Sequence, residues 1–192
     1  MLNIESELSG RPVFVTGASG FVGSHLVDKL VENDANVHAF VRATSSGELG
    51  NITHLADDIT VHRGDLRDKA SVKSALSTLK RTGDALIFHL GAQAHVGESW
   101  ERPYDTIDSN VVGTLNLLQS CIDLDLDIDK FDTAGTSEEY GNVNDEKSDL
   151  YDYSGDGGVL LSERSPVNPK SIYATSKLSA DFLTMNYYDA YG

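Results

Sequence analysis

Short apolar segments alternate with longer amphipathic ones along this chain. Residues 12–16 read PVFVT, and residues 21–32 then carry apolar side chains at the spacing of one helical face. The same change of period recurs down the sequence, which is typical of strands that alternate with helices. We therefore expect strands at residues 11–16, 36–41, 59–62, 85–90 and 128–133, and helices at residues 21–32, 68–79, 103–121 and 171–191.

This alternation predicts an α/β fold. Strand–helix–strand units build a parallel sheet with helices on both faces, because nearly all such crossovers are right-handed. Residues 85–90, ALIFHL, are apolar almost throughout, as expected of a strand buried on both faces. We expect one doubly wound domain over residues 1–192, with a long surface excursion over the polar residues 141–169.

Composition and charge exclude several classes of protein. The 192 residues are 40% hydrophobic, which suits one domain with a core, and the net charge of −15 repels nucleic acid phosphates. No apolar run approaches the roughly 20 residues of a membrane helix, and residues 1–11 lack a basic signal segment. We expect a cytoplasmic protein without membrane or nucleic acid partners. The excess acid fits either an ordinary acidic protein or adaptation to a salty cytoplasm, where stability rises with salt.

Cysteine and histidine give no sign of a metal site. The single cysteine, Cys121, excludes an internal disulfide framework and any cysteine-rich metal site. His25, His38, His54 and His62 have no metal-ligand spacing. We therefore expect no bound metal.

A glycine-rich turn follows the first predicted strand and opens the first predicted helix. It reads GASGFVG, in which Gly17 permits a tight turn, Gly20 permits close approach of a pyrophosphate, and Gly23 permits close helix–strand packing. The free N–H groups at the start of such a helix face phosphate oxygens. This context predicts a dinucleotide site rather than a merely tight turn.

Two further strand ends bear on the choice of cofactor. Many NAD-binding domains carry an acid after the second strand for the ribose 2′-hydroxyl, but this strand ends in Arg42, which suits a 2′-phosphate. We expect NADP, with NAD as the alternative. After the third strand, Asp65 is expected to accept a hydrogen bond from the adenine amino group, and Leu66 to pack on the ring.

The carboxyl-terminal half carries the candidate catalytic groups. Tyr173 and Lys177 have i, i+4 spacing and lie on one helical face, and an ammonium group beside a phenol stabilises the phenolate. Tyr173 is thus a candidate acid/base for interconverting an alcohol and a ketone. After the fifth strand, either Thr136 or Ser137 is expected to bond the reacting hydroxyl, and Glu138 to remove a proton from carbon.

The combined motifs resemble the extended short-chain dehydrogenase/reductase family of nucleotide-sugar enzymes. They occur in the family's order and cover nearly the whole chain. The matching segments are TGASGFVG at 16–23, GDL at 64–66, HLGAQAHVGES at 89–99, SNVVGTLNLL at 109–118, TSEEYG at 136–141 and YATSK at 173–177.

The resemblance implies a role for each matching residue. Tyr173 would be the base, Lys177 would hold the nicotinamide ribose, and Thr136 would assist at the sugar 4-hydroxyl. Asn110 would hold the active-site helix or serve a purely structural role. By the resemblance, the residues that contact the dinucleotide are Gly17, Gly20, Phe21, Val22, Asp65, Leu66, Leu90, Ala92, Tyr173 and Lys177.

Within the family, the chain looks most like the 4,6-dehydratases, and among them the GDP-mannose enzymes. TSEEYG carries the acid that many 4-epimerases lack, and VRATSSG resembles the GDP-mannose type. The implied chemistry is oxidation at C4, removal of the C5 proton by Glu138, loss of water from C6 and return of the hydride. The alternatives are a 4-epimerase or decarboxylase, or a dinucleotide-binding module without turnover.

Three expectations depart from or extend this pattern. Glu139 stands where related enzymes often carry an aliphatic residue, and it is expected either on the surface or as a change in the charge of the site. Family members exceed this chain in length, so we expect a truncated form that lacks the substrate lobe. The helices at 103–121 and 171–191 correspond to the pair that forms the family's dimer, which predicts a homodimer.

Overall fold

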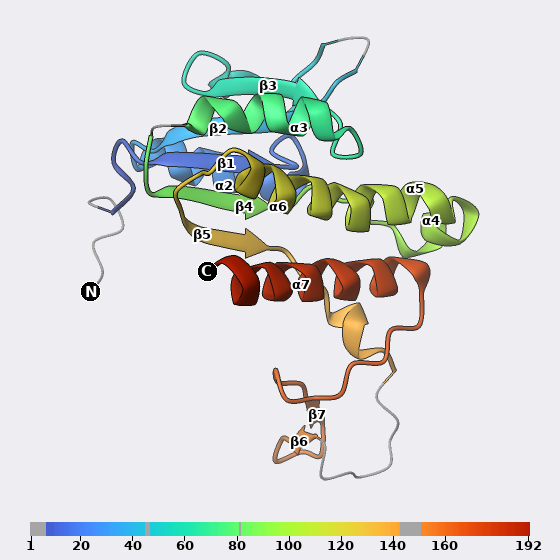
Figure 1. Cartoon of the computed structure of the whole chain (residues 1–192). Coiled ribbons are helices and arrows are strands. Elements are labelled where there is room, and N and C mark those ends of the chain that lie inside the picture. The colour runs from blue at the N-terminus through green and yellow to red at the C-terminus, as the bar shows by residue number, and fades with distance from the viewer. Residues whose placement is uncertain (1–6, 45–46, 81, 143–150) are drawn as a thin grey trace.

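A parallel five-stranded sheet forms the centre of the protein in the computed structural model, which describes residues 7–44, 47–80, 82–142 and 151–192 (Figure 1). The strand order is β3-β2-β1-β4-β5, and every neighbouring pair is parallel. The order reverses beside β1, which in such sheets is where a crevice forms at the carboxyl ends of the strands. The strands are β1 (Pro12–Thr16), β2 (Asn36–Arg42), β3 (Thr60–Gly64), β4 (Ala85–His89) and β5 (Ile128–Thr133).

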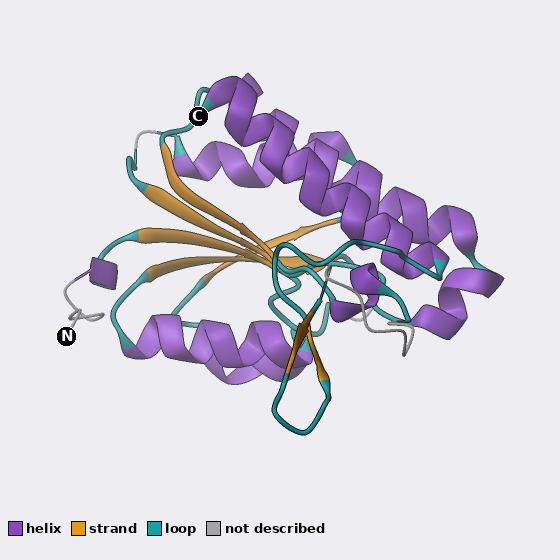
Figure 2. Ribbon diagram, turned by 90° about the horizontal axis from the view of Figure 1, so that it is seen from below, coloured by secondary structure: helices purple, strands orange, loops and turns teal. Residues whose placement is uncertain are grey.

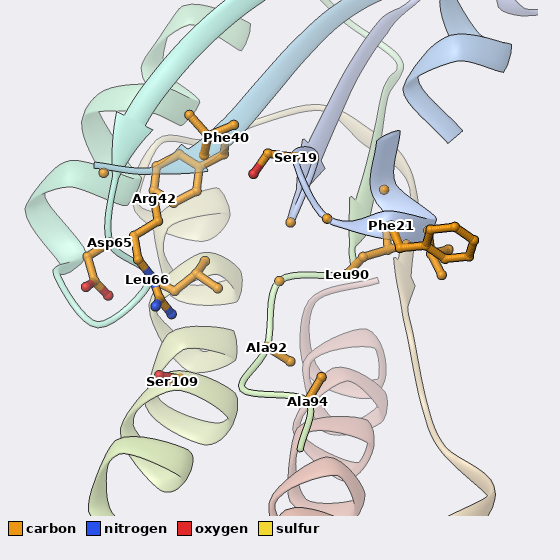
Figure 3. Close-up of a pocket in the computed structure, with 17 residues that line it drawn as sticks. Ser19, Phe21, Phe40, Arg42, Asp65, Leu66, Leu90, Ala92, Ala94 and Ser109 are labelled. Carbon is orange, nitrogen blue, oxygen red and sulfur yellow. The ribbon is translucent and has the colours of Figure 1, made fainter. Parts of the chain in front are cut away.

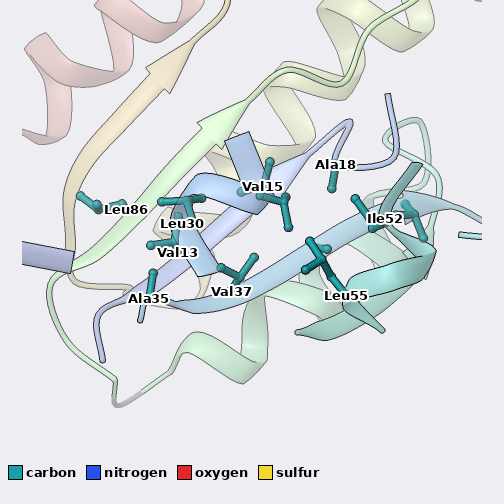
Figure 4. Close-up of a cluster of buried hydrophobic side chains, with 12 residues drawn as sticks. Val13, Val15, Ala18, Leu30, Ala35, Val37, Ile52, Leu55 and Leu86 are labelled. Atoms are coloured by element: carbon teal, nitrogen blue, oxygen red, sulfur yellow. The ribbon is translucent and has the colours of Figure 1, made fainter. Parts of the chain in front are cut away.

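Helices cover both faces of this sheet (Figure 2). On one face, α2 (Phe21–Glu32) and the short helix η1 (Gly50–Leu55) pack on a buried cluster that includes Val13, Val15 and Val37 (Figure 4). On the other face, a second cluster joins the sheet to α3 (Lys69–Leu76), η2 (Ser77–Leu79) and α6 (Gly113–Asp123). The last helix, α7 (Ile172–Tyr191), packs against α6 and β5. The prediction of a doubly wound α/β fold is confirmed.

Two predicted helix starts are formed by side-chain caps. Asp68 accepts a hydrogen bond from the backbone N–H of Ala70 over 3.0 Å at the start of α3. Ser171 Oγ accepts one from the N–H of Ala174 over 3.0 Å at the start of α7. Each cap satisfies an N–H group that has no partner within its own helix.

The predicted continuous helix over residues 103–121 is wrong in detail. The chain forms α5 (Pro103–Ile107), then a π-helical segment η3 (Asp108–Val112), then α6. A further helix, α4 (Val96–Glu101), precedes them and was not expected. Its six residues are too few for apolar periodicity to reveal.

The polar excursion over residues 141–169 carries a small hairpin in its described part. Strands β6 (Asp152–Tyr153) and β7 (Val159–Leu160) pair antiparallel and lie away from the main sheet (Figure 1). Three parts of the sequence discussed above lie outside the described residues. They are residues 143–150 of the excursion, residues 45–46 of VRATSSG, and residues 1–6 of the amino terminus, where no signal segment was expected.

Two findings concern membranes and metals. None of the helices in the described ranges combines the length and the apolar character that crossing a bilayer requires. Among the same residues, no group of three or more His, Cys, Asp or Glu side chains is arranged to hold a metal ion. Cys121 is free and buried on α6, where burial raises the pKa of its thiol to about 12.

Candidate active site

The glycine-rich turn between β1 and α2 is too tightly packed to accept larger residues. Gly17 has a φ of +68°, and a Cβ there would lie 2.8 Å from the backbone nitrogen of Gly91. A Cβ on Gly23 would lie 2.2 Å from the carbonyl oxygen of Gly17. Gly20 precedes α2 and has no side chain to screen the first N–H groups of that helix. The turn therefore offers backbone donors without steric cover, which fits a pyrophosphate.

A hollow of about 550 Å³ opens beside this turn (Figure 3). It lies at the carboxyl ends of four strands, as the topology predicts. Ser19, Phe40, Ala94 and Ser109 also line it. Ser19, Ala94 and Ser109 stand in the motifs quoted above but were not singled out there, and Phe40 belongs to no motif. Of the residues predicted to bind cofactor, the hollow brings together Gly17, Gly20, Phe21, Val22, Arg42, Asp65, Leu66, Leu90 and Ala92.

Two apolar residues stand open at the edge of the hollow. Phe21 is 77% exposed and Val22 is 63% exposed, although both begin the well-ordered helix α2. Large apolar side chains exposed at the edge of a cavity are the surface that a flat ring would cover.

The Asp65 carboxylate is already engaged. Arg67 donates to it through Nε over 3.0 Å and through Nη2 over 2.7 Å, and this pairing holds the pKa of Asp65 below its usual value. The Arg42 guanidinium adds to the same effect and lines the hollow near Asp65 (Figure 3). The sequence analysis did not single out Arg67, which donates hydrogen bonds to the same Asp65 carboxylate that was expected to bind the adenine amino group.

A buried histidine connects the end of β1 to α6. Thr114 donates to the carbonyl of Asn110 over 2.6 Å, so its oxygen is left to accept from His89 Nε2 at 2.9 Å. Thr16 accepts from the N–H of Gly91 over 2.9 Å and lies 2.7 Å from His89 Nδ1, to which it donates. Burial, with a contribution from the Lys177 charge, lowers the pKa of His89 to about 3, so the ring is neutral.

Asn110 joins two segments that meet at the site. Its side-chain oxygen accepts from the N–H of Gln93 over 2.7 Å, and its nitrogen donates to the Gln93 carbonyl over 3.0 Å. The same nitrogen donates to Ser176 Oγ over 2.9 Å, and Ser176 in turn donates to the carbonyl of Tyr173 over 2.7 Å. Asn110 thus joins α7 to the loop after β4, a contact that is compatible with both roles expected for it.

Tyr173 and Lys177 lie one turn apart in the first half of α7. Neither lines the hollow; both stand on a helix that packs against α4, α5, η3 and the short helix η4 (Ser137–Tyr140). Tyr173 is half-buried and Lys177 is buried. Burial lowers the pKa of Lys177, and the carboxylates of Glu139 and Asp181 act in the opposite direction.

The segment TSEEYG after β5 forms a capped turn. Thr136 Oγ1 accepts from the N–H of Glu138 over 3.3 Å, and the Thr136 N–H donates to Glu139 Oε1 over 3.1 Å. Glu138 is exposed, whereas Glu139 is buried. The expectation that Glu139 lies on the surface is therefore wrong, because its carboxylate is needed inside the turn as a cap.

The chain is similar to known GDP-mannose 4,6-dehydratases. The family model described as GDP-mannose 4,6 dehydratase matches residues 14–192. A GDP-mannose 4,6-dehydratase of Sordaria araneosa is 37% identical over 187 residues, which cover 96% of this chain and 31% of that protein. The human GDP-mannose 4,6 dehydratase is 33% identical over 194 residues, which cover 95% of this chain and 48% of that protein.

Solved structures of related enzymes share the fold. The UDP-glucose 4-epimerase of Thermus thermophilus in complex with NAD has a TM-score of 0.75 and 29% identity, covering 94% of this chain and 52% of that one. A dTDP-glucose 4,6-dehydratase double mutant of Streptomyces venezuelae with NAD bound has a TM-score of 0.75 and 28% identity, with the same two coverages of 94% and 52%.

The chain spans between about a third and a half of the length of the curated relatives described above. Its match to the family model starts within β1 and continues past the end of α7 to Gly192, and so includes the elements of the site. This chain belongs to the GDP-mannose 4,6 dehydratase family of nucleotide-sugar epimerases and dehydratases.

Proposed function

We propose that residues 1–192 are the dinucleotide-binding and catalytic half of a nucleotide-sugar 4,6-dehydratase, with the substrate lobe outside this sequence. The observation that carries this proposal is the exposed Glu138 carboxylate, which lies in the turn after β5, on a segment that packs against α7. Glu139, its neighbour, is turned inward and is committed to the Thr136 N–H. Glu138 is thus the acid of this turn that is free to meet a substrate.

The residues divide the reaction between them. A bound nicotinamide dinucleotide supplies a site that takes a hydride from sugar C4 and later returns it. Tyr173 removes the proton of the sugar 4-hydroxyl, and the Thr136 hydroxyl bonds the same oxygen. Lys177 holds the nicotinamide ribose. Glu138 then removes the C5 proton, which the C4 ketone has made acidic, and passes it to the C6 hydroxyl, which leaves as water.

NADP is the cofactor we propose. Arg42 lies at the end of β2 and lines the hollow, where a ribose 2′-phosphate would need a cation. Arg67 brings a second guanidinium to the neighbouring Asp65. The NAD-bound structures of the epimerase and the dTDP-glucose enzyme keep NAD as the alternative.

The test is a turnover assay of the chain with Glu138→Gln. The protein is incubated with GDP-mannose, UDP-glucose or dTDP-glucose in the presence of NADP or NAD. Mass spectrometry then shows whether the sugar nucleotide has lost one water. We expect Glu138→Gln to abolish water loss while reduced nicotinamide still forms, because the amide cannot accept the C5 proton. Glu163→Gln, on the exposed excursion, is the matched control. Undiminished water loss in Glu138→Gln would contradict the role of Glu138.

Two alternatives make different predictions in the same assay. An epimerase inverts C4 without losing water, and the fold shared with UDP-glucose 4-epimerase favours this reading. A binding module without turnover binds the dinucleotide but changes no sugar.

A second copy of the chain and a cytoplasmic location belong to the same proposal. Apolar side chains are exposed on the neighbouring helices α6 and α7, among them Leu115, Ile122, Phe182 and Met185. A homodimer would cover them, and a monomeric mass by light scattering would contradict it.

The single free cysteine, Cys121, fits a compartment in which disulfides are rare.

A further inference from the structure

Arg67 places a guanidinium group in the turn between β3 and α3, directly after two residues that line the hollow. These two residues are Asp65 and Leu66 (Figure 3). The Arg67 side chain is 42% exposed, and no step of the proposed reaction uses it. Its contacts therefore indicate what an arginine does at this position.

Three N–H groups of Arg67 hold the carboxylate of Asp65. The backbone N–H donates to Oδ1 over 2.9 Å, Nε donates to Oδ1 over 3.0 Å, and Nη2 donates to Oδ2 over 2.7 Å. Nε also lies 3.2 Å from Oδ2, to which it donates in part. Two parallel bonds from one guanidinium fix the plane of a carboxylate as well as its distance. Arg67 thus sets the orientation of the Asp65 side chain.

This arrangement leaves one acceptor site of the carboxylate open. An ionised carboxylate has about four acceptor sites. Oδ1 already receives two N–H groups, whereas Oδ2 receives Nη2 and a share of Nε. Within the part of the chain that the structure describes, Oδ2 therefore has room for one more donor. The adenine end of a dinucleotide offers such a donor in its amino group, and Leu66 offers the ring an apolar surface in the same hollow.

A second carboxylate holds Arg67 from the other side. Nη1 of Arg67 donates to Asp105 Oδ1 over 3.4 Å, and Oδ2 of Asp105 lies 2.6 Å from Arg102 Nη2. Asp105 belongs to α5, so the Arg67 guanidinium links the turn after β3 to this helix. A single exposed ion pair contributes little to stability, but a rigid guanidinium bonded along two edges has few other orientations. Arg67 is thus suited to orient Asp65 rather than to stabilise the fold.

We propose that Arg67 is a positioning residue that fixes the Asp65 carboxylate so that Oδ2 accepts the amino group of adenine, and that it thereby gives the site a preference for adenine. The inference rests on the proposed function, in which a nicotinamide dinucleotide fills the hollow. An acceptor that is already oriented loses less conformational entropy when the ligand binds. Arg67 acts through Asp65 and itself touches no part of the dinucleotide.

Three substitutions separate orientation from charge. Arg67→Gln removes the paired bonds but keeps the backbone N–H that donates to Asp65 Oδ1. Arg63→Gln is the matched control, because it removes the same charge four residues earlier, where the guanidinium donates to the Gly47 carbonyl over 3.0 Å. Asp105→Asn removes the ion pair from α5 and provides an independent test should Arg67→Gln fold poorly.

The experiment is calorimetric titration with NADP and with its analogue in which hypoxanthine replaces adenine. Hypoxanthine carries a carbonyl oxygen in place of the amino group, so it has no donor for Oδ2 at that position. We expect the unsubstituted chain to bind NADP about tenfold or more tightly than the analogue, which corresponds to one hydrogen bond to a charged group. This ratio should fall towards one in Arg67→Gln, fall partly in Asp105→Asn, and stay unchanged in Arg63→Gln.

Two results of this titration would overturn the proposal. One is an unchanged ratio in folded Arg67→Gln or, if that variant does not fold, in Asp105→Asn. The other is the absence of any preference for NADP over the analogue in the unsubstituted chain.

NAD and its hypoxanthine analogue test whether Arg67 instead binds the ribose 2′-phosphate directly. NAD lacks that phosphate, so a residue that orients Asp65 affects both cofactors alike. We expect the adenine preference to fall in Arg67→Gln for NAD as it does for NADP. If Arg67→Gln weakens NADP but leaves NAD and the adenine preference unchanged, Arg67 binds the phosphate itself and the proposal is wrong.

An NMR measurement on the chain without cofactor separates this inference from the proposed function. The Arg67 Nε–H signal, identified by its loss in Arg67→Lys, should exchange with water faster in Asp65→Ala, because its acceptor is gone. An unchanged exchange rate contradicts the positioning role. If the unsubstituted chain binds no dinucleotide, the proposed function fails, while the exchange rate still decides whether Arg67 holds Asp65.

Discussion

The side-chain nitrogen of Asn110 donates a hydrogen bond to Ser176 Oγ over 2.9 Å, although 66 positions separate the two residues in the chain. Asn110 lies in the π-helical segment η3, where the regular helix is interrupted. Ser176 lies on α7 between Tyr173 and Lys177. The interruption in one helix thus provides a contact that orients the proposed catalytic pair on another, a use of π segments that is common at functional sites.

Replacing Asn110 tests this connection. In Asn110→Ala, the Gln93 backbone groups and Ser176 lose buried partners, which should lower the free energy of unfolding by about 1–3 kcal/mol. Dinucleotide affinity should also fall, because α7 loses its link to the loop after β4. Denaturant unfolding and calorimetry measure the two effects. Asn33→Ala, at the partly exposed C-cap of α2 where only one hydrogen bond to the Lys29 carbonyl is lost, is the control; an equal loss in both variants would contradict the role of Asn110.

The glycine turn makes a steric prediction. In Gly23→Ala the new Cβ would lie 2.2 Å from the Gly17 carbonyl oxygen, so α2 must move away from β1. We expect a loss of about 1–3 kcal/mol in stability and a clear loss of dinucleotide affinity.

Gly97→Ala on α4 is the matched control for the glycine turn. A Cβ there would meet nothing within 4 Å, and thermal unfolding should be nearly unchanged or slightly improved. Equal dinucleotide affinity in Gly23→Ala and the unsubstituted chain would contradict the assignment of the turn.

Acid should destabilise the protein through its buried histidines. Burial and the neighbouring His62 lower the pKa of His38 from 6.5 to about 4, so the unfolded chain binds more protons than the folded one in this range. The stability that His38 contributes is therefore present above about pH 6.5 and is lost as the pH falls towards about 4. Denaturant unfolding of His38→Gln should show a shallower loss over this window, and an unchanged slope would contradict the prediction.

The net charge of −15 has two explanations, and the salt dependence of stability distinguishes them. If the chain is adapted to a salty cytoplasm, its melting temperature should rise as KCl increases over the molar range, because salt screens the repulsion between carboxylates. A flat or falling melting temperature would favour the ordinary acidic protein.

Much of the fold follows from local patterns in the sequence. The five sheet strands and the first and last helices appear close to their predicted bounds, because their apolar residues repeat at strand or helix spacing. Asp68 and Ser171 stand at the helix starts they were expected to mark. Nine of the residues predicted to bind cofactor line the same hollow, and the order of their segments along the chain already implies a shared crevice.

The remaining features depend on contacts that no local pattern carries. The π segment η3 places Asn110 against Gln93 and Ser176, neither of which is within a helical turn of it. The burial of Glu139 depends on how the turn after β5 packs against α7. Side by side in the sequence, Glu138 and Glu139 look alike, and only the fold separates the exposed one from the buried one.

The most direct test of the account is calorimetric titration of the 192-residue chain with NADP and NAD, repeated with Arg42→Ala. We expect both dinucleotides to bind, NADP more tightly, and Arg42→Ala to weaken NADP by about tenfold or more while changing NAD little, since a charge-assisted bond to phosphate contributes about 1.5–3 kcal/mol. Absence of binding in both low and molar salt would contradict the assembled dinucleotide site.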